Sequence, residues 1–196
     1  MQQLTLAEQE LARVSHLTRQ TLGFYRESSA AVSVEVPALI ESVLALYSNK
    51  FNSKNITVVR EFGECPPIQV VRGEMNQVVA NLVSNAADAV GNNGIITIRL
   101  TCKEREDGPV VHMVVEDDGP GVTAENAKRI FEPFFTTKKD VGTGLGLWVV
   151  KEIVERHGGA VEVNSLSGNG SRGAVFTILL PCNPGTPTLA DEEASA

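Results

Sequence analysis

The chain has 196 residues, of which 42% are hydrophobic and 21% charged, and its formal net charge is −7. This length and composition predict one sizeable globular domain with a short appendage. The negative charge disfavours a general nucleic-acid-binding surface. No apolar run is long enough to span a membrane, and the first residues lack the basic and apolar segments of a signal peptide.

Residues 4–27 are predicted to form one long helix. A heptad seam, polar toward its end, runs along it at alternating steps of three and four: Leu4, Ala7, Leu11, Val14, Thr18, Thr21 and Tyr25. Such a helix can lie on its own domain or form half of a helical hairpin in a dimer. A second apolar edge favours the hairpin, so residues 1–30 are predicted to be a dimerisation helix.

The rest of the chain alternates strand and helix patterns. Helices are predicted at 37–52, 74–90 and 123–130, and strands at 32–36, 56–62, 68–71, 95–102, 109–116, 160–164 and 174–180. Residues 183–196 are predicted to be a disordered tail, which leaves 31–182 as the main domain. The pattern predicts an α+β fold in two layers, with helices on one face of a mixed sheet.

Three cysteines, Cys65, Cys102 and Cys182, lie far apart in the sequence and lack metal-binding spacing. An odd number of scattered cysteines favours reduced thiols in the cytoplasm over a disulfide framework or a zinc site. His157, near the end of an amphipathic run at 148–157, is predicted to be structural.

Residues 142–147 have the sequence Gly-Thr-Gly-Leu-Gly-Leu and come directly before the amphipathic run. Glycines let backbone N–H groups approach a ligand, and the start of a helix suits a phosphate chain. The motif fits neither a Rossmann loop, because a polar segment precedes it, nor a P-loop, because no Gly-Lys-Ser/Thr ending follows. Taken alone, a flexible turn remains an alternative.

A polar face is predicted on the 74–90 helix. Asn81, Asn85 and Asp88 share one side of the helix, and the opposite side is apolar. Such a face needs water, a ligand or a metal, and amide oxygens can bind Mg²⁺ while phosphate oxygens complete its shell. A solvated polar face is equally consistent with this pattern.

The residues after the 109–116 strand are Asp117-Asp118-Gly119-Pro120-Gly121. A carboxylate at the end of a buried strand can accept a hydrogen bond from the exocyclic amine of a base, and the glycines leave room for the ring. The alternative is an ordinary Asp-Gly turn.

In this order, the Asn-x-x-x-Asn helix, the Asp-x-Gly-x-Gly segment, the Phe134-Phe135 loop and the glycine loop resemble the ATP-binding catalytic domain of bacterial sensor histidine kinases. This domain shares a superfamily with gyrase, mismatch-repair ATPases and heat-shock chaperones. The resemblance covers about 32–181, and residues 132–138 and 157–159 are similar to kinases of the nitrogen-regulator type. It implies the Bergerat fold, a two-layer sandwich that binds ATP and Mg²⁺ under a mobile lid.

The resemblance also implies roles for single residues. Asp117 would bind the adenine amine, with Gly119 and Gly121 shaping that end of the pocket. Asn85 would hold Mg²⁺ and Asn81 would support the metal and the phosphates, which makes both catalytic. The remaining nucleotide-binding residues would be Asp88, Phe131 and Lys138 of the lid, Gly142, Thr143, Gly144, Leu145, Gly146 and Leu147.

Some positions depart from the family pattern. Asp88 and Ala89 stand where many members carry a basic and an aromatic residue, and Ala174 stands where a Thr is common. One phosphate contact, one adenine stack and one water-mediated base contact would then be missing. His16 lacks the acidic neighbour of a phosphoacceptor, so the N-terminal helix resembles the second helix of the hairpin.

The predicted function is therefore a protein-histidine kinase domain. It would act on a histidine of a dimerisation helix absent from this chain, in the same or a sister subunit of a homodimer. A response-regulator receiver domain would then take the phosphate. Superfamily members that hydrolyse ATP have Glu where Asn81 lies, which favours transfer over hydrolysis. An anti-sigma-type serine kinase and a nucleotide-sensing scaffold without transfer activity remain alternatives.

Overall fold

The computed structural model describes residues 30–105, 108–138, 142–166 and 172–182. From Ala31 onward, these residues belong to one compact unit. The predicted dimerisation helix, with His16, and the predicted tail lie outside the described residues and stay predictions. Within the described residues, no helix combines the length and apolar character needed to cross a bilayer.

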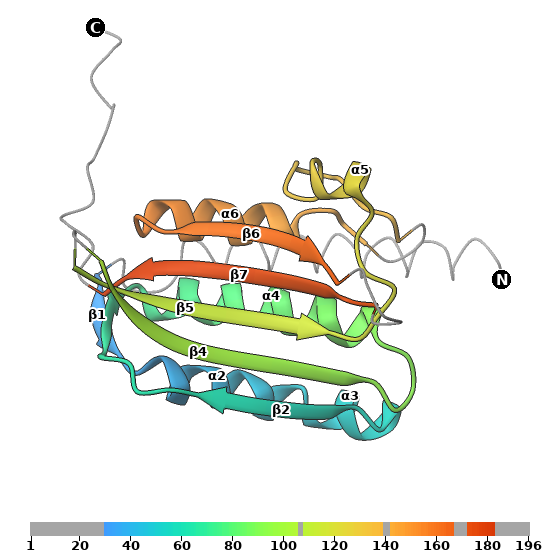
Figure 1. The fold of residues 1–196 in the computed structure, drawn as a ribbon, viewed down its shortest axis with the longest axis horizontal. Helices are drawn as coiled ribbons and strands as arrows, with labels where there is room; N and C mark the ends of the chain where they lie inside the picture. The colour runs from blue at the N-terminus through green and yellow to red at the C-terminus, as the bar shows by residue number, and fades with distance from the viewer. Residues whose placement is uncertain (1–29, 106–107, 139–141, 167–171, 183–196) are drawn as a thin grey trace, which may run out of the picture. The chain divides into compact units, whose positions relative to one another are not determined.

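A mixed five-stranded sheet forms one layer of the fold (Figure 1). β2 pairs in parallel with β4, and the other neighbouring pairs are antiparallel. The register aligns Leu100, Met113 and Ile178 in one row across three strands, and all three are fully buried. In sheet order the strands are β2 (Thr57–Phe62), β4 (Ile95–Arg105), β5 (Gly108–Asp117), β7 (Ala174–Pro181) and β6 (Ala160–Ser165).

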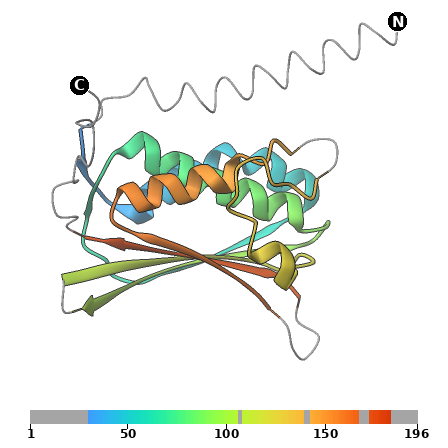
Figure 2. The same cartoon turned by 90° about the horizontal axis from the view of Figure 1, so that it is seen from above.

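Three helices cover one face of this sheet and form the second layer (Figure 2). They are α2 (Val36–Leu46), α4 (Arg72–Ala89) and α6 (Gly146–Arg156), and α4 contacts both of the others. Each helix buries a stripe of apolar residues against the sheet. The burial of this apolar surface holds the two layers together. The predicted α+β sandwich and both predicted long hairpins, β4–β5 and β6–β7, are confirmed.

Two predicted elements near the N-terminal side are wrong in extent. The helix predicted at 37–52 is split into α2 and α3 (Ser48–Lys54) at Tyr47, whose hydroxyl donates a 3.3 Å hydrogen bond to the Ala80 carbonyl of α4. The strand predicted at 32–36 ends early because α2 begins at Val36, with Pro37 in its first turn. The remaining strand, β1 (Val32–Val34), pairs with β3 (Ile68–Val70) in a separate two-stranded sheet.

The short helix predicted at 123–130 is only α5 (Ala124–Ala127), which the Thr123 hydroxyl caps by accepting from Asn126 N. His157 ends α6 and is buried. Its Nε2 accepts from Val71 N at 3.1 Å, and its Nδ1 lies 2.8 Å from the Ile153 carbonyl oxygen. The imidazole therefore joins the end of α6 to the start of α4, which agrees with the predicted structural role.

The three cysteines, scattered in the sequence, lie together in the structure, and all are free. Beyond the effect of burial, the Cys102 thiol is close enough to Cys65 and to Cys182 to raise the pKa of both. Burial and the neighbouring Cys102 thiol raise the pKa of Cys182 to about 11. The strand register puts this cluster at the end of the sheet away from Asp117, because Cys102 faces Val111 and Asp117 faces Ile96.

Candidate nucleotide-binding site

Helix α4 is the element that the predicted site residues share. Asn81, Asn85 and Asp88 are half-buried or exposed, whereas the apolar residues between them pack into the core: Leu82, Val83, Ala86 and Ala87. Asn81 Nδ2 donates a 3.1 Å hydrogen bond to the Gly146 carbonyl at the start of α6. The first asparagine therefore contacts the glycine loop, which lies far from it in the sequence.

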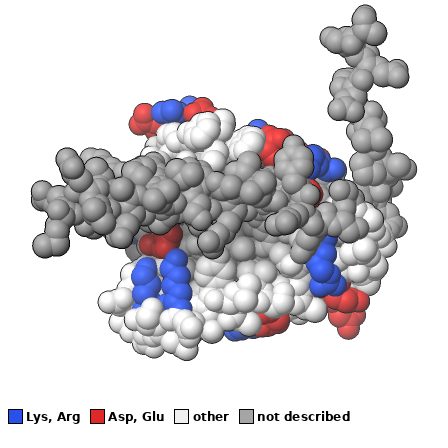
Figure 3. All heavy atoms as spheres, turned by 180° about the vertical axis from the view of Figure 1, so that it is seen from behind, with Lys and Arg blue, Asp and Glu red and all other residues white. Residues whose placement is uncertain are grey.

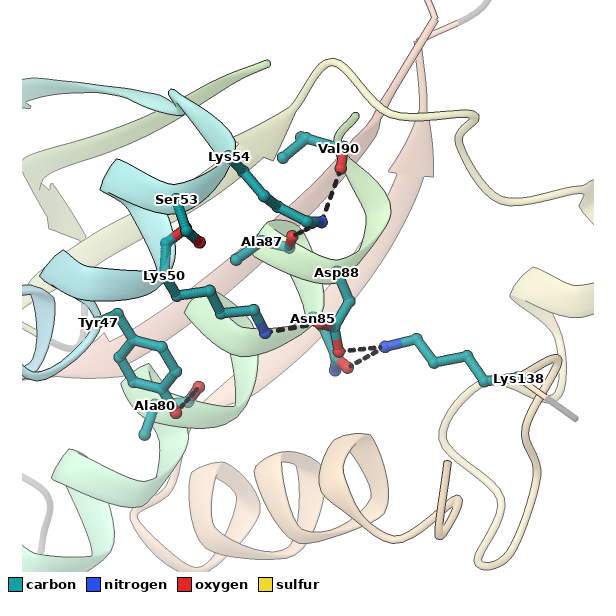
Figure 4. A network of polar contacts seen from close by, with 10 residues as sticks. All are labelled: Tyr47, Lys50, Ser53, Lys54, Ala80, Asn85, Ala87, Asp88, Val90 and Lys138. Carbon is teal, nitrogen blue, oxygen red and sulfur yellow. Dashed lines mark hydrogen bonds and ion pairs between the residues drawn. The ribbon is translucent and has the colours of Figure 1, made fainter. Parts of the chain in front are cut away.

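The second half of this face carries an ion-pair network (Figure 4). Lys138 Nζ lies 2.8 Å from Asp88 Oδ2 and 3.5 Å from Asn85 Oδ1, and Lys50 Nζ of α3 lies 2.6 Å from Asp88 Oδ1. Partial burial raises the pKa of Asp88, but its hydrogen bonds to Lys138 and Lys50 outweigh this and hold that pKa below its ordinary value. Lys50 was not predicted, because nothing in its own sequence context marks it.

Basic and acidic side chains lie next to each other on the helix-bearing side of the domain, at the α3 end (Figure 3, lower left). Lys54 of α3 donates to the carbonyl oxygens of Ala87 and Val90 at 2.7 and 3.1 Å. These carbonyls belong to the last turn and the C-cap of α4, where a cation is favourable. Helix α3 is thereby held against the end of α4 that carries Asp88.

Asp117 ends β5 and is only 2% exposed. Its Oδ1 accepts hydrogen bonds from Gly119 N at 2.9 Å and from Ala174 N at 3.4 Å. Burial raises the pKa of Asp117, and these two backbone hydrogen bonds oppose the rise. Among the described residues no hydrogen bond reaches Oδ2, so this oxygen can accept one from a ligand.

The start of β7 packs closely on Asp117, which sequence reasoning missed. Gly173 has φ +153°, and a Cβ there would lie 1.9 Å from the Asp117 carbonyl oxygen, so only glycine fits. Gly121, with φ +78°, lies in the same region, where the Ser165 hydroxyl accepts from Val122 N at 2.8 Å. In the sequence, the only indication that Gly173 matters is its position directly before a predicted strand.

The glycine loop is folded onto the phenylalanine loop. Gly144 has φ +68°, and a Cβ there would lie 2.3 Å from the carbonyl carbon of Phe134, which itself has φ +66°. The Thr143 hydroxyl accepts from Leu145 N at 3.3 Å and tightens the turn. Helix α6 begins at Gly146, two residues before the predicted run, so the last part of the motif is helical.

The predicted lid residues lie near this loop. Phe131 and Phe135 are half-buried, and the Arg129 guanidinium lies 4.6 Å from the centre of the Phe135 ring. A Cβ on Gly142 would lie 2.3 Å from the Thr136 hydroxyl oxygen, so the first glycine passes close to the same segment. The lid segment and the glycine loop therefore form one substructure beside α4.

These residues fit a nucleotide and a divalent cation. Asp117 offers a carboxylate oxygen, and the N–H groups of Gly146, Leu147 and Trp148 precede the first intrahelical bond of α6, from Val149 N to Leu145 O. Asn85 Oδ1 already faces a cation, the Lys138 ammonium. Among the described residues no three His, Cys, Asp or Glu side chains are grouped to hold a metal, so phosphate oxygens and water would complete the shell of Mg²⁺.

Residues 71–184 match the family described as "Histidine kinase-, DNA gyrase B-, and HSP90-like ATPase". The chain belongs to this ATPase family. The match includes all the predicted nucleotide-binding residues, and the sheet and helix layers are those of the Bergerat fold that the resemblance implied.

Within this ATPase family, the relatives of the chain include sensor histidine kinases. The chain is 37% identical over 176 residues to the sensor histidine kinase ZraS of Escherichia coli O157:H7, covering 89% of this chain and 37% of ZraS. The chain thus spans about a third of the length of the curated relatives that it matches. The catalytic domain of the histidine kinase ThkA in a nucleotide-free form has a TM-score of 0.69 at 32% identity, covering 79% of this chain and 99% of that one.

The ThkA kinase in complex with the response regulator protein TrrA is a further structural match. It has a TM-score of 0.71 at 28% identity and covers 94% of this chain and 52% of the matched chain. The similarity therefore extends to a kinase observed together with its response regulator.

Proposed function

We propose that this chain is the ATP-binding catalytic domain of a sensor histidine kinase. It would transfer the γ-phosphate of ATP to a histidine on a dimerisation helix of the same or a sister subunit of a homodimer. The observation that carries the proposal is that two segments meet on α4. At the end proposed to bind the base, a Cβ on Gly119, next to Asp117, would lie 3.0 Å from the Ala89 carbonyl oxygen, and at the end proposed to bind the phosphates Gly146 and Lys138 contact Asn81 and Asp88. The family match and the kinase names of the relatives support it.

Each end has a task in this proposal. Asp117 Oδ2 accepts from the adenine amine, while Oδ1 stays bound to Gly119 and Ala174 N–H groups. The glycine loop and the start of α6 receive the phosphates through backbone N–H groups. Asn85 holds Mg²⁺, which when bound neutralises phosphate charge, and Lys138 adds a further positive charge.

Transfer is favoured over hydrolysis because of Asn81. Its amide Nδ2 is engaged with the Gly146 carbonyl, and an amide cannot take a proton from an attacking water. A histidine acceptor supplies its own nucleophile, so the domain needs only to orient the phosphates and neutralise their charge. Asn81 therefore cannot act as the general base that hydrolysis would need, whereas transfer to a histidine does not need one at this position.

The partner proposals follow from the same assignment. A response-regulator receiver domain would take the phosphate from the histidine, and the likeness to ThkA in complex with its response regulator supports this. We also propose that the domain works in the cytoplasm, because ATP is made and kept inside cells.

The test uses ATP labelled on the γ-phosphate, Mg²⁺ and a separate dimeric helical hairpin that carries a histidine followed by an acidic residue. With ATP below the Kd of the wild-type chain, we expect acid-labile label on the hairpin with the wild type and at least tenfold less with Asp117→Asn. Acid-stable label would indicate the serine-kinase alternative. ATP binding without any transfer would indicate a nucleotide-sensing scaffold, and the absence of ATP binding would overturn the proposed function.

A further inference from the structure

The Asp88 carboxylate lies between two cationic side chains from distant parts of the chain (Figure 4). Lys50 Nζ is 2.6 Å from Oδ1 and Lys138 Nζ is 2.8 Å from Oδ2. Because each lysine uses its own oxygen, Lys50 orients the carboxylate whether or not Lys138 is present. The hydrogen bonds of Lys54 to the end of α4 keep α3, and so Lys50, in place.

The Lys138 ammonium lies close to two side-chain oxygens of α4. Its Nζ lies within 3.5 Å of both Asn85 Oδ1 and Asp88 Oδ2. Carboxylate and amide oxygens are ligands that Mg²⁺ accepts directly or through its bound waters. A divalent cation held by Asn85 would therefore compete with the ammonium for the same pair of oxygens.

The negative charge of Asp88 also affects the binding of a triphosphate. A carboxylate beside the phosphate-binding residues repels a metal-free triphosphate, and it also occupies Lys138, which would otherwise meet the phosphates. A divalent cation removes both effects, because it neutralises the phosphates and takes the place of the ammonium. The exposure of Asp88, 39% for its side chain, makes the repulsion moderate through screening.

We propose that Asp88 makes nucleotide binding depend on the divalent cation. Without metal it retains Lys138 and repels the phosphate chain; with metal its Oδ2 supports the ion next to Asn85, and Lys138 is released to the phosphates. The proposal rests on the proposed function, because it assumes that ATP binds at this face of α4.

The test measures ATP affinity by titration calorimetry, once in EDTA and once in excess Mg²⁺. For the wild-type chain we expect Mg²⁺ to raise the affinity by about tenfold or more, a usual size for coupling between two ligands. Asp88→Asn should raise the metal-free affinity and lose most of this enhancement. Asp88→Glu, which keeps the charge, should retain more of it, and Lys50→Gln should keep the metal-free affinity low.

Glu41→Gln is the matched control, because it removes one negative charge from a carboxylate that pairs with Arg60, apart from the network. It should leave the Mg²⁺ enhancement unchanged. An Asp88→Asn protein with the wild-type enhancement, or with equal losses in both conditions, would overturn the proposal and leave ATP binding intact. A wild-type chain that binds no ATP in either condition would overturn the proposed function itself.

Discussion

At the scale of single residues, the proposed function gives the two oxygens of Asp117 separate tasks. In Asp117→Asn the amide oxygen can keep the hydrogen bonds from Gly119 N and Ala174 N, while the NH₂ group replaces the oxygen that faces the ligand. This NH₂ group and the exocyclic amine of adenine are both hydrogen-bond donors, so they could not bond to each other. We expect ATP affinity to fall by about 10- to 100-fold, the value of one charged hydrogen bond.

Calorimetric titration with ATP and Mg²⁺ measures this loss, and far-UV circular dichroism checks that the variant is folded. GTP, which has a carbonyl where adenine has its amine, provides a second control. An unchanged ATP affinity in the folded variant would show that Asp117 does not contact the base.

The same aspartate predicts a pH dependence of stability. Burial holds the pKa of Asp117 above its ordinary value, so between the unfolded and the folded pKa the folded protein binds more protons. Its contribution to stability is therefore present at low pH and is lost as the pH rises through the folded pKa. Asparagine does not titrate, so Asp117→Asn should gain stability relative to the wild type as the pH rises from about 4.

Urea unfolding of both proteins across the acid-to-neutral range measures this difference. The substitution also changes hydrogen bonds, which shifts the free energy of unfolding by the same amount at every pH. The decisive quantity is therefore how the difference in free energy of unfolding between the two proteins changes with pH. A difference that stays flat would mean that the folded and unfolded pKa values are equal.

At the scale of elements, the glycine loop depends on a backbone that only glycine adopts easily. Gly144→Ala would put a Cβ 2.3 Å from the Phe134 carbonyl carbon at φ +68°. We expect a loss of about 1–3 kcal/mol in the free energy of unfolding and a weaker ATP affinity, because the loop must move. Gly91→Ala is the control: nothing lies within 4 Å of its Cβ position. Its effect should stay within about 0.5 kcal/mol.

Thermal unfolding and ATP titration of the two variants provide the comparison. Equal stabilities and affinities would mean that the close contact between the two loops does not persist in solution.

His157 joins two helices rather than taking part in chemistry. His157→Ala leaves the Val71 N–H group without its acceptor and should cost about 1–3 kcal/mol of stability. ATP affinity should be kept, because the imidazole lies at the far end of α6 from the glycine loop. A melting curve and an ATP titration test this, and a variant that keeps its stability but loses ATP binding would contradict it.

The elements also show where sequence reasoning works. Strand β4 was predictable because apolar and polar residues alternate from Ile96 to Lys103, as expected where one face of a strand is buried. The break at Tyr47 was not, because it accompanies a hydrogen bond to Ala80, which is remote in the sequence. Lys50 and Gly173 were missed for the same reason: their partners, Asp88 and Asp117, become neighbours only in the folded chain.

At the scale of the whole molecule, the motifs of the site come from both layers. The polar face is on the central helix, the carboxylate proposed to bind the base ends the central strand, and the glycine loop opens the adjacent helix. The order of these motifs could be identified from the sequence. Their convergence on α4 could not be worked out from the residue pattern alone, and the family resemblance supplied it.

Asp117 also ties the turn after β5 to the start of β7, through the two N–H groups on its Oδ1. A nucleotide bound at its other oxygen therefore requires that distant parts of the chain be assembled, and the unfolded chain has no such site. By thermodynamic linkage, ATP at a hundred times its Kd should add about 2.7 kcal/mol to the free energy of unfolding. A rise of the melting temperature with ATP and Mg²⁺ that is clearly smaller in Asp117→Asn would verify this, and the cell's ATP level would then help to set the fraction of the domain that is folded.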